Sequence, residues 1–269
     1  MDQGSPRQEE DSQLDERVAR HMEQTMRFVL AAQPATTLDD RFVRLITGEP
    51  HPLGNMAFLN DTTDAASASD AIGPLVSSGH PSAVLGCSSP SEGVHNLLIE
   101  NGYVSEGPMP EMAIAIESIS KTNIPQGYEF VRILDQASSE AWTQALAQGY
   151  GLPVPLAALF APHAFGGTDP APDASVQWFG IAKGDTIVAV SMLNVMDGLA
   201  GIYCVATLEE ERGKGLGAHV TAEPLRLAAR AGIQTGILQS SEMGYPVYER
   251  IGFNRVGEMP LYIRMPQGD

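Results

Sequence analysis

Cysteine is nearly absent from this chain, which has only two in 269 residues, Cys87 and Cys204. Both stand in apolar, strand-like runs, so we expect free buried thiols, with a disulfide or a shared metal ion as the alternative. No His/Cys cluster has the spacing of metal ligands, and no Gly-x-Ser-x-Gly segment marks a nucleophilic serine turn. The sequence therefore predicts neither a metal site nor a disulfide framework.

Long apolar runs are absent as well. No stretch has the length of a membrane-spanning helix, and the polar, acidic residues 1–5 do not resemble a secretory signal. We therefore expect a cytoplasmic protein that does not enter membranes.

Positive charge is scarce, because 33 Asp and Glu residues oppose 16 Lys and Arg residues and give a net charge of −17. Such a surface disfavours nucleic acids and anionic membranes as partners. It would attract cationic ligands such as amines, although solubility alone would also explain the acidity. We therefore expect neither nucleic acid nor membrane among the partners.

The most informative stretch is the segment 212–217, Arg-Gly-Lys-Gly-Leu-Gly, which joins an apolar strand-like run at 201–207 to a helix-like run at 218–231. Glycines let the backbone approach a ligand closely, and a helix start adds unpaired N–H groups and the positive end of the helix dipole. Together these features favour an anion-binding turn that would fit a pyrophosphate.

Two known phosphate-binding motifs do not fit this turn. The dinucleotide fingerprint needs Gly-x-Gly-x-x-Gly, but the glycines here fall at 213, 215 and 217. The Walker loop needs Ser or Thr after its lysine, but Gly215 follows Lys214. The remaining pattern, Arg-x-x-Gly-x-Gly after a strand, resembles the acetyl-CoA loop of the GNAT N-acetyltransferase superfamily.

A second segment strengthens the resemblance, which covers roughly residues 127–266. Residues 248–253, Tyr-Glu-Arg-Ile-Gly-Phe, are similar to the family's Tyr-x-x-x-Gly-Phe element. The resemblance implies that Tyr248 protonates the departing CoA thiolate, with core packing as its alternative role. It also implies a set of acetyl-CoA-binding residues: Val205, Ala206, Thr207, Arg212, Gly213, Lys214, Gly215, Leu216, Gly217 and Ser241. Of these, Ser241 stands where many family members carry Asn.

The general base is not marked by a motif. Glu209 stands near the end of the strand that precedes the glycine-rich turn, and Glu242 follows the next strand at 236–240. Either could take a proton from an amine through water, and a plain surface position is the alternative for each. Because the three glutamates at 209–211 would repel phosphates if they pointed into the turn, we expect all three to face solvent.

The first half of the chain looks like a partial copy of the second. Residues 102–110 align without gaps on residues 252–260, with the shared frame Gly-aromatic-x-x-x-Gly-x-Met-Pro. The copy lacks the chemistry, because residues 60–67 hold no Arg-x-x-Gly-x-Gly and Leu98 stands in the place of Tyr248. We interpret the first half as a degenerate domain of the same kind that cannot bind CoA. A chance match of one short segment is the alternative.

Local patterns also predict details of several elements. Residues 65–72 are predicted to form a helix that the Gly-Pro pair at 73–74 ends. Trp178 and Phe179 are neighbours in a strand, so we expect them on opposite faces of a sheet. The loop at 161–175 is expected to lie over the site.

The sequence thus predicts an α/β (α+β) protein with two GNAT-like domains, each a mixed, largely antiparallel sheet flanked by helices. A polar N-terminus with an amphipathic helix is expected at 1–36, the degenerate domain at 37–122 and the acetyltransferase domain at 127–269. The resemblance implies an acetyl-CoA-dependent N-acetyltransferase that acts on a small amine by direct attack. The alternative function is a CoA-binding sensor or regulatory module without turnover. A homodimer is compatible with the sequence.

Overall fold

The computed structural model describes residues 6–165 and 175–266 of the chain, which form two compact units. The first unit holds the described residues up to Glu111 together with those from Val256 onward, and the second holds Met112–Arg255. The boundaries at residues 111/112 and 255/256 each fall within a strand that belongs to the sheet of the second unit. No helix among the described residues combines the length and the apolar character needed to cross a bilayer.

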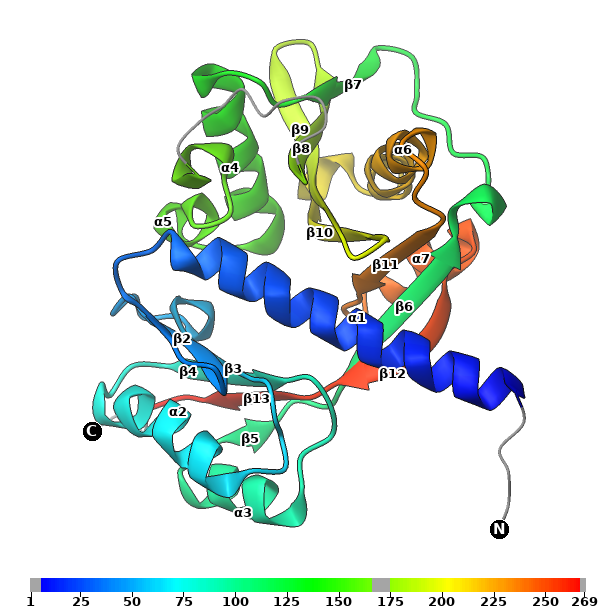
Figure 1. Ribbon diagram of the computed structural model, residues 1–269. Helices are drawn as coiled ribbons and strands as arrows, with labels where there is room; N and C mark the ends of the chain where they lie inside the picture. The colour runs from blue at the N-terminus through cyan, green and yellow to red at the C-terminus, as the bar shows by residue number, and fades with distance from the viewer. Residues whose placement is uncertain (1–5, 166–174, 267–269) are drawn as a thin grey trace. The chain divides into compact units, whose positions relative to one another are not determined.

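The first unit contains a six-stranded sheet of order β1-β2-β3-β4-β13-β5, in which β3 and β4 run parallel (Figure 1). Its core includes Phe42, Ala71, Val84, Leu98 and Tyr262. In chain order its elements are α1 (Pro6–Ala31), β1 (Thr36–Leu38), β2 (Phe42–Ile46), a 3₁₀ turn (Pro52–Gly54), β3 (Asn55–Leu59), α2 (Ala65–Ser77), β4 (Ser82–Gly86), α3 (Glu92–Glu100), β5 (Val104–Ser105) and β13 (Leu261–Arg264).

Helix α2 passes through Pro74 and ends at Ser77, so the prediction that the Gly-Pro pair ends this helix is wrong. Proline has no N–H, so the carbonyl of Asp70, four residues earlier, receives no hydrogen bond from it. Arg44 of β2 supplies the donor instead, because its Nη1 lies 2.9 Å from the Asp70 carbonyl oxygen and 3.3 Å from that of Ala71. A side chain distant in sequence thus stabilises a helix that its own sequence would interrupt.

The second unit is built on a seven-stranded sheet of order β12-β6-β11-β10-β9-β8-β7. Its strands β7 to β10 pair antiparallel, and β10 pairs parallel with β11, so the predicted mixed, largely antiparallel α/β fold is confirmed. In chain order its elements are β6 (Met109–Ala115), a 3₁₀ turn (Ile116–Ser118), β7 (Tyr128–Arg132), α4 (Gln136–Tyr150), α5 (Val154–Ala158), a 3₁₀ turn (Pro162–Phe165), β8 (Val176–Lys183), β9 (Thr186–Met196), β10 (Leu199–Thr207), a 3₁₀ turn (Glu209–Glu211), α6 (Leu216–Arg230), β11 (Thr235–Gln239), α7 (Tyr245–Ile251) and β12 (Asn254–Met259). Most of the loop expected over the site, residues 166–174, lies outside the described residues.

Helices lie on both faces of the second sheet, with α4 and α6 flanking its central strands in Figure 1. On one face, the indole N–H of Trp178 donates to the carbonyl of Phe160 at 2.7 Å. On the other, Phe179 stacks on Phe130 at 5.3 Å, and Phe130 meets the ring of His219 in α6 at 6.0 Å. Trp178 and Phe179 therefore face opposite sides, as predicted.

Two strands join the sheet that the other half of the sequence mainly builds. β6 carries the end of the frame at 102–110, yet it lies between β12 and β11 in the seven-stranded sheet. β13 follows the frame at 252–260, yet it lies between β4 and β5 in the six-stranded sheet. Each half of the sequence thus supplies one strand to the sheet that the other half mainly builds.

Candidate functional site

The parallel strand pair of the second sheet opens toward its carboxyl end. β10 and β11 pair only from Leu199/Thr235 to Gly201/Ile237, whereas β10 continues to Thr207. The second half of β10 therefore has no partner in β11 along that edge. The carboxyl ends of parallel strands are where open α/β sheets bind ligands.

A β-bulge changes the direction of β10 at this point. The register with β9 shifts between Tyr203 and Ala206. Cys204, within the shift, has a φ of +53°, a left-handed conformation that is uncommon outside glycine. Residues 205–207, which are expected to bind acetyl-CoA, thus lie at and directly after the bulge, on the part of β10 that β11 leaves unpaired.

Both cysteines are free and partly buried. Burial raises the pKa of Cys204 to about 12 and also raises that of Cys87. Both thiols are therefore neutral at physiological pH, and neither is poised to act as a nucleophile. Among the described residues, no group of three or more His, Cys, Asp and Glu side chains is arranged to hold a metal ion.

The glycine-rich turn has a backbone that glycine adopts most readily. Gly213 and Gly215 have φ values of +77° and +80°, and Gly215 is the N-cap of α6. No side chain caps this helix start, and the first helical hydrogen bond joins the His219 N–H to the Gly215 carbonyl. The N–H groups of residues 216–218 are therefore available to an anion.

Arg212 fixes the turn to its surroundings. Its Nη2 donates to the Gly149 carbonyl of α4 at 3.0 Å, and its Nε donates to the Thr207 carbonyl of β10 at 3.3 Å. Both acceptors are uncharged carbonyls, so these contacts do not neutralise the positive charge of the guanidinium. Arg212 thus holds the turn against α4 and β10 and adds positive charge beside it.

Glu211 is buried, so the prediction that all three glutamates at 209–211 face solvent is wrong for this residue. Its Oε1 accepts a hydrogen bond from Lys183 Nζ at 2.7 Å. Its Oε2 accepts from Lys214 Nζ and from the Tyr128 hydroxyl, each at 2.5 Å. A carboxylate is costly to bury unless it is paired and hydrogen-bonded, and these three donors meet that requirement.

These contacts give Glu211 a dependence on acid that we expect to be measurable. Hydrogen bonds from Lys183, Lys214 and Tyr128, in that order of effect, lower the pKa of Glu211 from 4.5 to about 2. A carboxyl with a lowered folded-state pKa stabilises the fold above its unfolded pKa, and this stabilisation is lost as the pH falls through the folded pKa. The melting temperature of the wild type should therefore fall more between pH 4.5 and pH 2 than that of Glu211→Gln.

Circular dichroism melts of both proteins from pH 7 to pH 2 would test this expectation. All other carboxyl groups titrate alike in the two proteins, so the difference between the two curves isolates Glu211. Parallel curves would contradict the assigned role of its three donors.

Tyr248 lies in α7 and is buried, with 8% of its surface exposed. Its ring packs edge-on against Phe253, and a Cβ added to Gly244 would lie only 2.9 Å from its Cε2, so that position favours glycine. Burial raises the pKa of Tyr248 well above its ordinary value, and the Thr221 hydroxyl opposes this effect only in part. The phenol is therefore protonated at neutral pH, which is the state that a general acid requires.

Ser241 takes part in the entry to α7. Its hydroxyl oxygen accepts a hydrogen bond from the Gly244 N–H at 3.1 Å, and its carbonyl accepts from the Ser240 hydroxyl at 2.8 Å. Ser241 and both candidate bases, Glu209 and Glu242, are exposed. A contact of these three residues with a ligand stays a prediction.

Sequence reasoning overlooked Tyr150, the last residue of α4. The preceding Gly149 lets this helix end approach β10, because a Cβ there would lie 2.8 Å from the Ala206 Cβ. The residue is 52% exposed, yet burial of its hydroxyl end, with Cys204 and Tyr248 nearby, raises its pKa. Tyr150 thus lies near Cys204 and Tyr248, and its only signal in the sequence is a Gly-Tyr pair that ends a helix.

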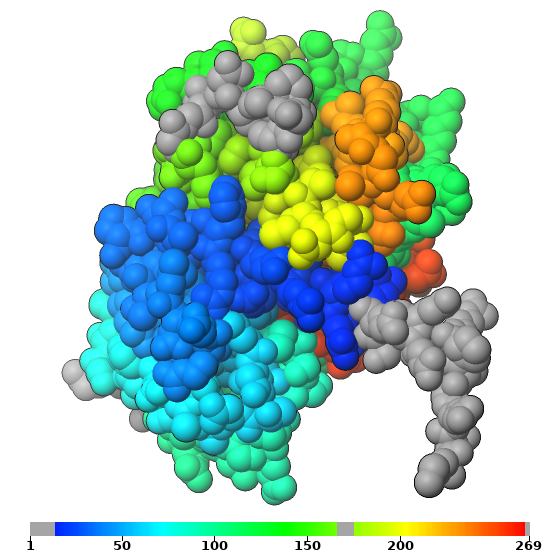
Figure 2. All heavy atoms as spheres, in the orientation of Figure 1, coloured from blue at the N-terminus to red at the C-terminus, as the bar shows by residue number. Residues whose placement is uncertain are grey.

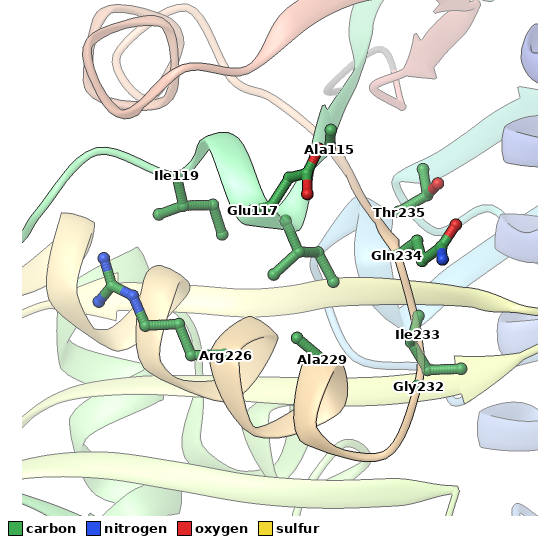
Figure 3. Close-up of a pocket in the computed structure, with 10 residues that line it drawn as sticks. Ala115, Glu117, Ile119, Arg226, Ala229, Gly232, Ile233, Gln234 and Thr235 are labelled. Carbon is green, nitrogen blue, oxygen red and sulfur yellow. The ribbon is translucent and has the colours of Figure 1, made fainter.

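A cavity of about 660 Å³ lies at the other end of α6, between residues 115–119 and the last turn of the helix (Figure 3). In Figure 2, α6 (orange) lies at the surface beside the green segment before β7, which Arg226 holds through the Ser120 carbonyl at 2.9 Å. Because α6 has 15 residues, this cavity is about 20 Å from the glycine-rich turn. It contains none of the site residues predicted from the sequence.

The corresponding strands of the first unit do not open. β3 and β4 stay paired up to their carboxyl ends, from Met56/Ala83 to Leu59/Gly86. Thr62 fills the space beyond them, because a Cβ added to Gly86 would lie 2.3 Å from the Thr62 Cγ2. No gap between the strands is left for a ligand there.

The helix that follows these strands is also closed to an anion. The side chain of Asp64 is the N-cap of α2 and accepts a hydrogen bond from the Ala66 N–H at 3.0 Å. The carboxylate therefore occupies the place at which α6 leaves N–H groups unpaired, and its negative charge would repel a phosphate. Both observations support the interpretation of the first unit as a degenerate copy.

Comparisons with known proteins agree with this geometry. The model of the acetyltransferase (GNAT) family matches residues 141–253, which include β10, the glycine-rich turn and α7. No curated protein sequence matches the chain.

Solved structures with a similar fold include several acetyltransferases. A GCN5-related N-acetyltransferase from Kribbella flavida is 18% identical, with a TM-score of 0.64 over 94% of this chain and 96% of that one. One from Sphaerobacter thermophilus is 15% identical, with a TM-score of 0.59 over 85% and 78%. A tandem GNAT protein from the clavulanic acid biosynthesis pathway is 12% identical, with a TM-score of 0.53 over 88% and 85%. At these identities the likeness shows the fold alone.

Proposed function

We propose that the protein transfers an acetyl group from acetyl-CoA to the amine of a small acceptor, because residues 141–253 match the model of the acetyltransferase (GNAT) family. One observation carries the proposal. β10 and β11 stop pairing after Gly201/Ile237, and the turn that follows β10 presents unpaired N–H groups at the start of α6. An elongated ligand with a pyrophosphate at one end and an acyl thioester at the other fits this combination.

In this proposal the turn holds the pyrophosphate. The N–H groups of residues 216–218 and the positive end of α6 would face the phosphate oxygens, with Arg212 and Lys214 adding charge. Pantetheine would run along the unpaired edge of β10, where residues 205–207 offer backbone groups. One N–H donor to the thioester oxygen as it gains charge would stabilise the transition state by about 3 kcal/mol.

The chemical step is a direct attack on the thioester. The neutral amine nitrogen adds to the acetyl carbon, the carbon–sulfur bond breaks, and the thiolate takes the proton of Tyr248. The amine gives up its proton to Glu209 or Glu242 through water, and the tyrosinate then regains a proton from solvent. Positioning of the two reactants against each other adds several kcal/mol, by making the attack effectively intramolecular.

The first unit would not bind acetyl-CoA, because Thr62 fills the gap and Asp64 caps the helix. In this proposal each chain therefore has a single acetyl-CoA site, which lies in the second unit. The acceptor would be a small amine, for which the net charge of −17 is favourable.

The proposal predicts thiol release that depends on both acetyl-CoA and an amine. The purified protein would be incubated with acetyl-CoA and a panel of polyamines, amino sugars and amino acids, with free CoA thiol measured by a chromogenic disulfide. Mass spectrometry would check that the accepted amine gains one acetyl group. Lack of any acetyl-CoA binding in calorimetry would refute the proposal.

A further inference from the structure

The chain contains only three lysines, and two of them meet on one buried carboxylate. Lys183, at the end of β8, and Lys214, in the glycine-rich turn, contact the two oxygens of Glu211 at 2.7 and 2.5 Å. The third, Lys121, is exposed in the segment that precedes β7. A protein with so few lysines thus places two of them side by side next to its anion-binding turn.

The arrangement holds both ammonium groups in place. Their nitrogens lie 5.4 and 5.9 Å from the centre of the Tyr128 ring, and the Lys214 nitrogen also lies 3.3 Å from the Tyr128 hydroxyl oxygen. An ammonium group has three donors, so each lysine keeps hydrogen-bonding capacity beyond its contact with Glu211. Because the carboxylate fixes both side chains before a ligand arrives, less conformational entropy is lost on binding.

The cluster also keeps a net positive charge. Glu211 neutralises one of the two ammonium groups, and the Lys183 and Lys214 side chains remain 50% and 36% exposed. The neighbouring Glu209 and Glu210 are exposed, and the whole protein is strongly acidic. A polyanionic ligand would therefore be repelled by most of this surface and attracted to the cluster.

We propose that Lys183 binds the 3′-phosphate of coenzyme A and makes the protein select CoA over 3′-dephospho-CoA. This inference rests on the proposed function, which places the pyrophosphate on the glycine-rich turn. Lys214 belongs to that turn, whereas Lys183 comes from a different strand and lies on the other oxygen of Glu211. Coenzyme A likewise carries its 3′-phosphate on the ribose to which its pyrophosphate is attached.

The test compares the binding of CoA and 3′-dephospho-CoA by calorimetry, without an acceptor amine. The wild type should bind CoA about five- to tenfold more tightly, which is the range expected for a charged hydrogen bond that solvent partly screens. Lys183→Met should reduce this ratio to less than about twofold, chiefly by weakening CoA. The matched control, Lys121→Met, removes the same charge from an exposed position and should leave the ratio unchanged.

The outcomes separate this inference from the proposed function. Equal affinity of the wild type for the two ligands would overturn the inference, and so would a ratio that survives Lys183→Met. Failure of the wild type to bind either ligand would refute the proposed function itself. If Lys183→Met unfolds, Lys183→Gln, which keeps a donor to Glu211 but no charge, gives the same comparison.

Discussion

Replacement of Gly215 by valine should raise the dissociation constant for acetyl-CoA by at least about 100-fold, which corresponds to about 2.7 kcal/mol. Gly215 has a φ of +80°, and a β-branched residue is strained in this left-handed region by about 1–2 kcal/mol. Relief of the strain would rotate the backbone and displace the N–H groups that are proposed to bind the phosphates. The side chain would also occupy the surface that the pyrophosphate needs.

The matched control for this variant is Gly232→Val at the other end of α6. Gly232 has a φ of +92°, and a Cβ added there meets no atom within 4 Å, so the backbone strain is similar but the site is remote. Calorimetry should show intact acetyl-CoA binding by Gly232→Val, and the two variants should melt at similar temperatures. Binding by Gly215→Val within tenfold of the wild type would contradict the role of the turn.

Replacement of Tyr248 by phenylalanine should lower kcat by about 10²- to 10³-fold, within the usual range for the loss of a general acid. The dissociation constant for acetyl-CoA should change little, because the ring still packs against Phe253 and Gly244. The same buried setting raises the pKa of the phenol, which therefore keeps its proton across the neutral range. Steady-state rates with the accepted amine, together with calorimetry, would separate the two effects.

The pH profile gives a second measure of the same residue. Since the pKa of Tyr248 is raised, its loss of the proton should depress kcat only above about pH 10, the ordinary tyrosine value. Tyr245→Phe removes a hydroxyl from the same helix and should retain wild-type turnover. A fall in kcat of less than about threefold in Tyr248→Phe would assign this tyrosine to core packing alone.

The two units differ in ways that a sequence repeat does not reveal. In the second unit, the parallel strands part and the following helix start is free of caps. In the first, β3 and β4 stay paired, Thr62 occupies the gap and Asp64 caps α2. One chain thus holds an open and a closed form of the same strand–turn–helix arrangement, and the proposal of a single CoA site per chain rests on this contrast.

Much of the second unit follows from local sequence. The glycines at 213 and 215 take up left-handed conformations, and a helix begins directly after them. Trp178 and Phe179 alternate across their strand, and the Gly-Phe pair at 252–253 ends α7. Such features depend on backbone sterics within a few residues, so a sequence is sufficient to predict them.

The sequence does not predict contacts between segments that are far apart in the chain. Glu211 looked like its two neighbours, and only the fold brought Lys183 from β8 and Tyr128 from β7 to it, some 28 and 83 residues away. The local pattern predicts a helix end at Pro74, because it does not show that Arg44, distant in the sequence, donates to the Asp70 carbonyl that Pro74 leaves without a donor. The same limit explains why Gly149 and Tyr150 were overlooked.

The sequence by itself indicated much of the order of strands and helices, the glycine-rich turn before α6, the resemblance of this turn to the GNAT acetyl-CoA loop, and the lack of such a turn in the first half. The tertiary structure alone decided that β6 and β13 each join the sheet of the other half, that β10 and β11 part after three residue pairs, and that Glu211 is buried between two lysines. The physical reason is the separation along the sequence of the groups that interact. Turn and helix geometry is set by sterics between near neighbours, whereas sheet membership and the pairing of a buried charge are set by which distant groups the chain has to satisfy.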